Sequence, residues 1–307
     1  MAEHKDIFIH IGAQKTASAL LRRTAMRLKP ELAAAGVSLM TRAEIAAEPF
    51  HDHVHRLNTR DALRSDPVSR EVMDSLARVV KRPEPRILLM SESLFSRLPL
   101  DSFFQNISES LAFLKNHWDP HRVRLILYVR RQSSFVTSCY AQFISMGRTF
   151  SFEDFTGGAV PEHLNWHRVC SDIADVIGRE NLIVRPYETI GEAGATKYVT
   201  DFFEIMGVSK GIADRVEEVT SLGAKSNRGL SQAAIEIARV GNDVLKEKER
   251  IKLRRFLQNT FSTASHPKPV FWSKEQEAEL HAHYAASNSA LFQEFMPDRD
   301  PSALGYV

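Results

Sequence analysis

The sequence lacks the features that place a chain in a membrane or in an oxidising compartment. None of its apolar runs approaches the ~20 residues that a helix needs to span a bilayer. The apolar run near the N-terminus is too short for a signal-peptide core. Only two cysteines, Cys139 and Cys170, are present, so no disulfide framework is expected. The cytoplasm is therefore the expected location.

The chain also lacks a strong charge of one sign. Its 40 Lys and Arg residues nearly balance 38 Asp and Glu residues, and the net charge of +2 is too small to imply nucleic acid or a membrane surface as a partner. Any charge that binds an anion must be local. Hydrophobic residues make up 43% of the 307 residues, which is enough to bury a sizeable core. The composition is compatible with an enzyme of one α/β domain.

Short β-branched runs alternate with amphipathic patterns along the first two thirds of the chain. The predicted strands are 6–11, 37–40, 86–90, 123–129 and 181–185. The predicted helices are 18–35, 68–81, 102–117, 132–146, 162–178, 195–206, 229–259 and 273–295. This alternation predicts crossover connections and a parallel sheet in an α/β core over 1–208, with a helical part over 209–307. Ligands of such folds bind beyond the carboxyl ends of the strands.

The segment 10–19 is the most informative stretch, because it joins an apolar run to a helical pattern. The unpaired N–H groups and the dipole at a helix start attract phosphate. Gly12, Lys15, Thr16 and Ser18 supply a tight turn, a cation and two hydroxyls. A Walker A loop needs Gly directly before the Lys, but Gln14 stands there. The loop is two residues shorter and suits a single phosphate.

A second cluster follows the strand 123–129. Arg130 and Arg131 come directly after it, and Ser138 lies two turns into the next predicted helix. An Arg at a strand end can make bidentate, charge-assisted bonds to a phosphate. Ser138 would add one more donor to the same cleft. The alternative interpretation is a surface arginine pair at the start of a helix.

A third strand, 86–90, ends in the polar residues Ser91, Glu92 and Ser93. Glu92 is the candidate general base, because transfer of a group to a hydroxyl requires a proton acceptor. The competing interpretation is that Glu92 caps a following helix, where the dipole favours a carboxylate.

The run Lys15-Thr16-Ala17-Ser18 resembles the 5′-phosphate loop of sulfotransferases that use 3′-phosphoadenosine-5′-phosphosulfate (PAPS). That family usually carries Lys-Thr-Gly-Thr or Lys-Ser-Gly-Thr. Ala17 is compatible with the position if the residue is helical, since only a positive φ demands Gly. Arg130 and Ser138 stand at the family's spacing of Arg, seven residues, Ser. The residues that follow Arg130 are more similar to those of bacterial members of the family than to those of animal cytosolic members.

The resemblance implies a P-loop NTPase-like three-layer α/β fold with PAPS as cofactor and PAP as its product. Gly12, Lys15, Thr16, Ala17 and Ser18 would bind the 5′-phosphate. Arg130 and Ser138 would bind the 3′-phosphate, and Lys15 and Glu92 would be catalytic. Arg228, in the run 226–229, would be a further 3′-phosphate contact unless this run only caps the next helix. No metal is required, because Lys and Arg supply the positive charge.

Two other functions stay open beside sulfuryl transfer to a hydroxyl of a carbohydrate, glycolipid or small metabolite. A small-molecule kinase would bind ATP and depend on Mg²⁺, and the absent Walker glycine counts against it. A non-catalytic nucleotide-binding protein of the same fold is the other alternative. The histidines of the segment 51–55 are expected in a solvent-exposed or acceptor-binding loop rather than in a metal site.

Overall fold

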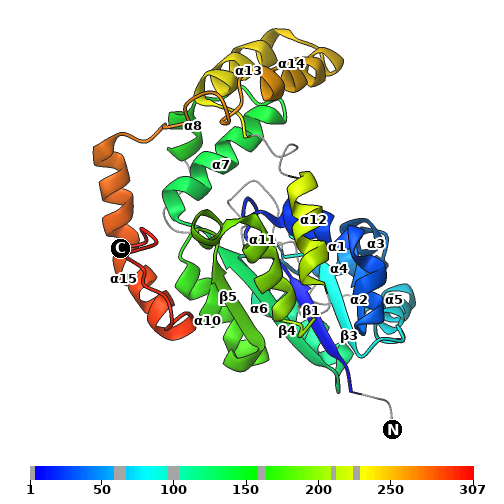
Figure 1. Cartoon of the computed structure of the whole chain (residues 1–307). Coiled ribbons are helices and arrows are strands. Elements are labelled where there is room, and N and C mark those ends of the chain that lie inside the picture. Colours follow the sequence, from blue (N-terminus) through cyan, green and yellow to red (C-terminus); the bar gives the residue numbers. More distant parts are fainter. Residues whose placement is uncertain (1–3, 59–66, 96–103, 158–163, 209–211, 224–228) are drawn as a thin grey trace.

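A five-stranded parallel sheet forms the centre of the protein in the computed structural model, which describes residues 4–58, 67–95, 104–157, 164–208, 212–223 and 229–307. The strands are β1 (Asp6–His10), β2 (Val37–Met40), β3 (Arg86–Met90), β4 (Arg122–Val129) and β5 (Leu182–Pro186). Their spatial order is β2-β3-β1-β4-β5, and every pair is parallel (Figure 1). The predicted α/β class with a parallel sheet is confirmed.

The sheet is buried on both faces, so its strands are apolar at nearly every position. Ile7 and Ile9 point to one core, whereas Phe8 between them points to the other. This alternation is the period of two that the pleat imposes. Two helical layers therefore cover the sheet, as the crossover connections require.

The first face is covered by helices that follow β2, β3 and β4. They are α4 (Pro49–Asn58), α5 (Arg70–Val80), α6 (Ile107–Trp118) and α10 (Trp166–Ile177), with the short α3 (Arg42–Ala46) beside β3 and the 3₁₀ turn η2 (Arg179–Asn181) before β5. The second face is covered by α1 (Ser18–Arg27), α2 (Lys29–Ala34), α11 (Thr189–Glu204) and α12 (Ala213–Gly223).

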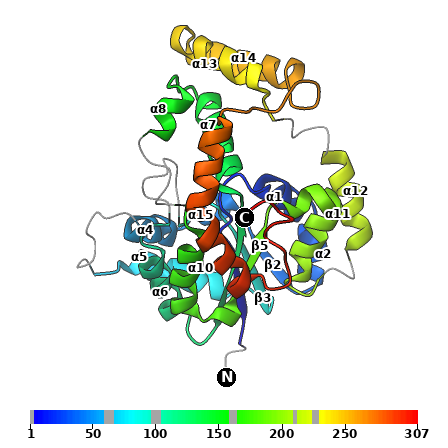
Figure 2. The same ribbon diagram turned by 90° about the vertical axis from the view of Figure 1, so that its left-hand side faces the viewer.

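A third, smaller core lies beyond the carboxyl edge of the sheet. It forms where the outer half of α7 (Gln132–Ser145) meets α8 (Phe152–Thr156), α13 (Gln232–Val244) and α14 (Glu247–Thr260). Tyr140 and Ile144 of α7 pack there against Ile235 and Leu257. Figures 1 and 2 show the α13–α14 hairpin standing apart from the sheet, with α15 (Lys274–Phe295) running back to the body.

Several predicted helix boundaries are wrong. The pattern 18–35 is two helices that meet at Leu28, because Pro30 cannot donate the N–H that a continuous helix needs. The pattern 229–259 is likewise two helices, α13 and α14. The predicted helix 195–206 corresponds to the later part of a longer helix, Thr189–Glu204, which contains a non-helical Gly194.

The segment 51–55 was predicted as a loop, but it lies within the helix α4. Phe50 and Val54 stand one turn apart and are fully buried, so packing selects the helix despite the polar residues between them. None of the described helices has the length and apolarity needed to cross a bilayer.

Candidate functional site

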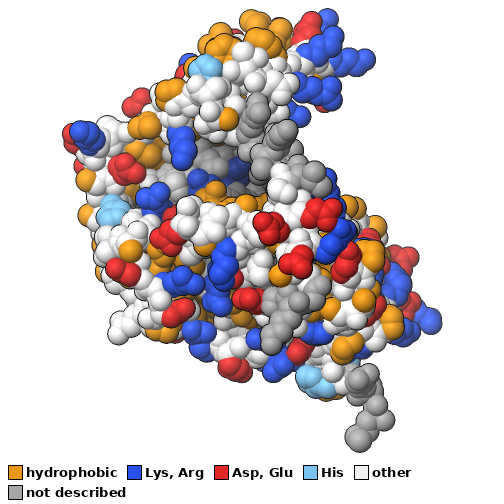
Figure 3. Space-filling view, in the orientation of Figure 1, with side chains coloured by type: hydrophobic (Ala, Val, Ile, Leu, Met, Phe, Trp, Pro, Cys, Tyr) orange, Lys and Arg blue, Asp and Glu red, His pale blue; other side chains and the backbone are white. Residues whose placement is uncertain are grey.

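A cavity of about 1670 Å³ lies at the carboxyl edge of the sheet, between the body and the α13–α14 hairpin. Figure 3 shows it as a hollow with Lys and Arg side chains inside. The predicted site residues that line it are Lys15, Ala17, Ser18, Glu92, Arg130 and Ser138. These residues follow β1, β3 and β4, three neighbouring strands. The fold thus brings together residues that are more than 100 positions apart in the sequence.

The loop between β1 and α1 is held in place by backbone and side-chain bonds. The N–H groups of Ile11 and Ala13 donate to carbonyls of β4, which extends the strand pairing. Thr16 is fully buried, and its hydroxyl donates to Ala13 O at 2.6 Å. The Tyr198 hydroxyl donates to Thr16 O at 3.1 Å. The Thr16 side chain therefore supports the loop and does not line the cavity.

Gly12 lies where no side chain fits. Its φ is +29°, and a Cβ at this position would be 2.9 Å from Ser18 Oγ and 3.2 Å from His10 Nε2. Ser18 Oγ is buried and has no hydrogen-bond partner among the described residues. Since Ser18 is the first residue of α1 and lines the cavity, its hydroxyl is placed to bind an anion at the helix start.

Lys15 reaches the cavity from the same loop. Its Nζ lies 3.3 Å from Gln142 Oε1 of α7. Burial lowers the pKa of the Lys15 ammonium, and the charge of Arg130 lowers it as well. An anion entering the cavity would oppose this effect and stabilise the charged form of the lysine.

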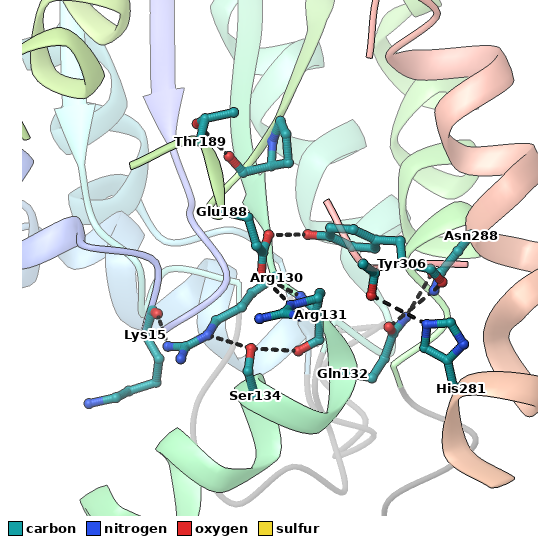
Figure 4. Close-up of polar contacts among 12 residues, drawn as sticks. Lys15, Arg130, Arg131, Gln132, Ser134, Glu188, Thr189, His281, Asn288 and Tyr306 are labelled. Atoms are coloured by element: carbon teal, nitrogen blue, oxygen red, sulfur yellow. Dashed lines mark hydrogen bonds and ion pairs between the residues drawn. The ribbon is translucent and has the colours of Figure 1, made fainter. Parts of the chain in front are cut away.

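Arg130 is fixed by three contacts at the end of β4 (Figure 4). Its Nη1 donates to Lys15 O at 2.7 Å, and its Nε donates to Ser134 Oγ at 2.9 Å. Its guanidinium lies over the Tyr187 ring, 4.6 Å from the centroid. A guanidinium has five N–H donors, so these two bonds leave N–H groups for a ligand.

The cavity face of α7 consists of small and polar residues at helical spacing. They are Ser133, Ser134, Thr137, Ser138, Ala141, Gln142 and Ser145. Ser138 is at the centre of this face, while Ser134 one turn earlier accepts the bond from Arg130. The repeat of hydroxyl and amide residues every three or four positions was visible in the sequence and could have indicated the whole face.

Residues near the C-terminus hold the segment 130–132, which follows β4, in place (Figure 4). The sequence did not indicate these contacts. The Tyr306 hydroxyl donates to Glu188 Oε2 at 2.7 Å, and Glu188 Oε1 accepts the backbone N–H of Arg131 at 3.0 Å. Gln132 and Asn288 exchange amide hydrogen bonds at 2.9 and 3.2 Å. The tail and α15 therefore set the position of the residues that follow β4.

Glu92 also lies at the cavity, but it is ion-paired. Its Oε1 is 2.8 Å from Arg22 Nη1 and 4.0 Å from Arg42 Nη1. Burial would raise the pKa of the Glu92 carboxyl, but a backbone hydrogen bond and the charge of Arg22 outweigh it and lower the pKa. The side chain is thus an ionised proton acceptor whose partner Arg22 was not predicted.

Arg228, another predicted site residue, lies outside the described residues. Of the histidines in α4, His51 is buried and lines the cavity, whereas the His53 ring packs on Phe113 at 4.6 Å between centroids. Over the described ranges, no group of three or more His, Cys, Asp or Glu residues could hold a metal ion.

The chain was also compared with known proteins. No protein-family model and no curated protein sequence matches it. A sulfotransferase from Alicyclobacillus acidocaldarius has a similar structure, with 13% identity, 97% of each chain covered and a TM-score of 0.48. Retinol dehydratase in complex with androsterone and the inactive cofactor PAP is another, with 10% identity, 97% of this chain and 83% of that chain covered, and a TM-score of 0.42. At these values the likeness concerns the arrangement of helices and strands only.

The backbone of Ala17 has φ 56° and ψ 18°, so the helical conformation that would suit an alanine is not present. The left-handed region costs an L-residue roughly 1–2 kcal/mol. We expect Ala17→Gly to raise the free energy of unfolding by about 1 kcal/mol, measured by urea denaturation. The matched control is Ala19→Gly, inside α1, which should lower it by a similar amount. If Ala17→Gly and Ala19→Gly changed the free energy of unfolding equally, a left-handed backbone at Ala17 would be contradicted.

His10 makes the fold sensitive to acid. Burial lowers its pKa from 6.5 to about 4. Below pH 6.5 His10 is protonated in the unfolded chain but stays neutral in the folded one. The contribution of His10 to the free energy of unfolding is therefore fully present above pH 6.5 and decreases toward pH 4, by at most about 3 kcal/mol. The His10→Phe variant keeps the edge-on packing against Phe202. We expect a flatter pH dependence of its unfolding free energy than in the parent chain, and parallel curves would exclude His10 as the cause.

Proposed function

We propose that this chain is a PAPS-dependent sulfotransferase that moves the sulfuryl group to a hydroxyl of a carbohydrate, a glycolipid or a small metabolite. The observation that carries the proposal is that Lys15, Ser18, Arg130 and Ser138 line one cavity. The cavity contains two groups that can bind an anion: the loop at the start of α1, and Arg130 after the neighbouring strand. This arrangement suits a nucleotide with two separate phosphates.

The loop and the start of α1 would bind the 5′-phosphate. Ser18 Oγ has no hydrogen-bond partner among the described residues. The first N–H groups of a helix have no carbonyl within the helix to which they can donate. Lys15 adds a positive charge from the same loop and lines the same cavity. As the bond to sulfur breaks, Lys15 would balance the charge that builds on the departing phosphate oxygen.

Arg130 and Ser138 would bind the 3′-phosphate. The contacts to Lys15 O, Ser134 and Tyr187 fix the guanidinium plane before the ligand arrives. A charged donor held in place loses little side-chain entropy on binding. Ser138, on the cavity face of α7, would donate its hydroxyl to the same phosphate.

Glu92 would accept the proton of the acceptor hydroxyl as the oxygen–sulfur bond forms. Its carboxyl is ionised, as a base must be, and it lines the same cavity as Lys15. The ion pair with Arg22 weakens it as a base.

A kinase is the second candidate, since the loop also suits the β-phosphate of ATP. The loop is shorter than a Walker A loop by two residues and has Gln14 before Lys15. The kinase therefore stands as the alternative outcome of the binding test.

Calorimetric titration of the purified chain with PAP, beside ATP plus Mg²⁺, tests the proposal. We expect micromolar PAP binding and at least tenfold weaker ATP binding, because the site matches a 3′,5′-bisphosphate. Preferential binding of ATP would favour the kinase. Binding of neither nucleotide would refute the cofactor assignment altogether.

The same titration on Arg130→Ala assigns the 3′-phosphate contact. Removal of one partner of a buried charge-assisted pair costs about 2–4 kcal/mol, which is roughly a 30- to 1000-fold loss of PAP affinity. Arg42→Ala is the matched control, because Arg42 lines the cavity beside Glu92 and should leave the affinity within about threefold. Equal losses in both variants would remove the special role of Arg130.

Lys15→Ala tests the transfer step itself. We expect the variant to fold with a normal far-ultraviolet circular dichroism spectrum and to lose transfer by at least 10²-fold, because the lysine acts on charge that develops in the transition state. The measurement is transfer of ³⁵S from labelled PAPS to a panel of hydroxyl acceptors. Turnover equal to that of the parent chain would contradict the mechanism.

A further inference from the structure

Exposed large hydrophobic side chains gather on the α13–α14 hairpin. On α13, Ile237, Val240 and Val244 are 43%, 62% and 77% exposed. Their spacing of three and four residues places them on one face of the helix. On α14, Phe256 is 55% exposed, and Ile251 is 38% exposed. A cluster of this kind at one end of a molecule marks an interaction surface.

Positive charge is concentrated in the same hairpin. Helix α14 contains five basic residues and two acidic ones, although the whole chain is nearly neutral. Lys248, Lys252 and Arg255 are exposed and share a face of α14 at spacings of four and three residues. Figure 3 shows hydrophobic side chains along the upper edge, over α13, and Lys and Arg side chains at the adjoining corner.

The end of the hairpin and the segment that follows it line the cavity. Gln258 near the end of α14 lines the cavity, as do Thr263, Lys268 and Val270 in the segment that follows. Val270, in the segment after the hairpin, is 68% exposed and also lines the cavity. Whatever contacts the hairpin therefore lies beside the entrance for the acceptor.

We propose that the α13–α14 hairpin docks on an anionic lipid bilayer. A helix that combines an exposed apolar face with basic residues lies in the interface, with the apolar groups among the acyl chains and the cations at anionic headgroups. A second copy of this chain is a poorer occupant, because a symmetric contact would bring the basic faces against each other. Docking would present the cavity to hydroxyls of lipid-linked acceptors, a consequence that rests on the proposed sulfuryl transfer.

Vesicle co-sedimentation tests the docking without any cofactor. The full chain is mixed with vesicles of phosphatidylcholine alone or with 30 mol% phosphatidylserine, in 0.1 M and 0.5 M NaCl. We expect binding to the anionic vesicles only, weakened by salt because screening reduces the attraction. Binding to neither vesicle, or equal binding to both, would overturn the proposal.

Paired variants locate the surface. Lys248→Gln with Lys252→Gln should lower the partition coefficient about 25-fold, because each basic residue strengthens binding about fivefold. The control Arg27→Gln with Lys81→Gln removes two exposed charges from the body and should leave it unchanged. Val240→Ser with Val244→Ser should also release the chain from vesicles, whereas Met26→Ser with Met73→Ser, exposed on the body, should not.

Two further readouts separate the outcomes. PAP affinity in vesicle-free solution should be the same in the hairpin variants and the parent chain, so failure of docking and failure of the cofactor assignment are distinguishable. Sedimentation equilibrium should show a monomer. A dimer that Val240→Ser with Val244→Ser converts to monomer would assign the surface to a second copy and overturn the proposal.

Discussion

The bond from Arg130 Nη1 to Lys15 O is the contact on which the site depends. It joins the loop after β1 to the end of β4, the two adjacent strands at the centre of the sheet. Because the acceptor is a backbone oxygen, the bond positions Arg130 relative to the loop independently of the conformation of the Lys15 side chain. Lys15 and Arg130 thus line one cavity, and a ligand of opposite charge would offset the desolvation of Lys15.

Tertiary contacts from the end of the chain support this arrangement. Tyr306 acts through Glu188 on the backbone N–H of Arg131, and Trp166 Nε1 donates to Arg130 O at 2.8 Å. The residues after β4 are therefore fixed from both sides before any ligand binds. Such preorganisation is what electrostatic catalysis requires, since groups that are already oriented need no reorganisation in the transition state.

The fold and most of the candidate site were predictable because their signals are local. Apolar β-branched runs separated by amphipathic patterns predicted the parallel sheet, and the turn after each strand identified Lys15, Glu92 and Arg130 as residues that would meet. What failed was equally local. The break at Leu28 comes from Pro30, whereas the helix at Pro49–Asn58 comes from the burial of Phe50 and Val54, and periodicity alone indicates neither.

The sequence by itself determined which chemical groups stand at the strand ends, since strand order and spacing along the chain place them at one edge of any parallel sheet. Only the tertiary structure decided which of those groups face the cavity. The Thr16 hydroxyl donates to Ala13 O, the Ser18 hydroxyl has no partner within the part of the chain that the structure describes, and Glu92 pairs with Arg22, which lies 70 positions away. The physical reason is that a side chain's hydrogen-bond partner depends on packing between distant elements, which no local pattern encodes.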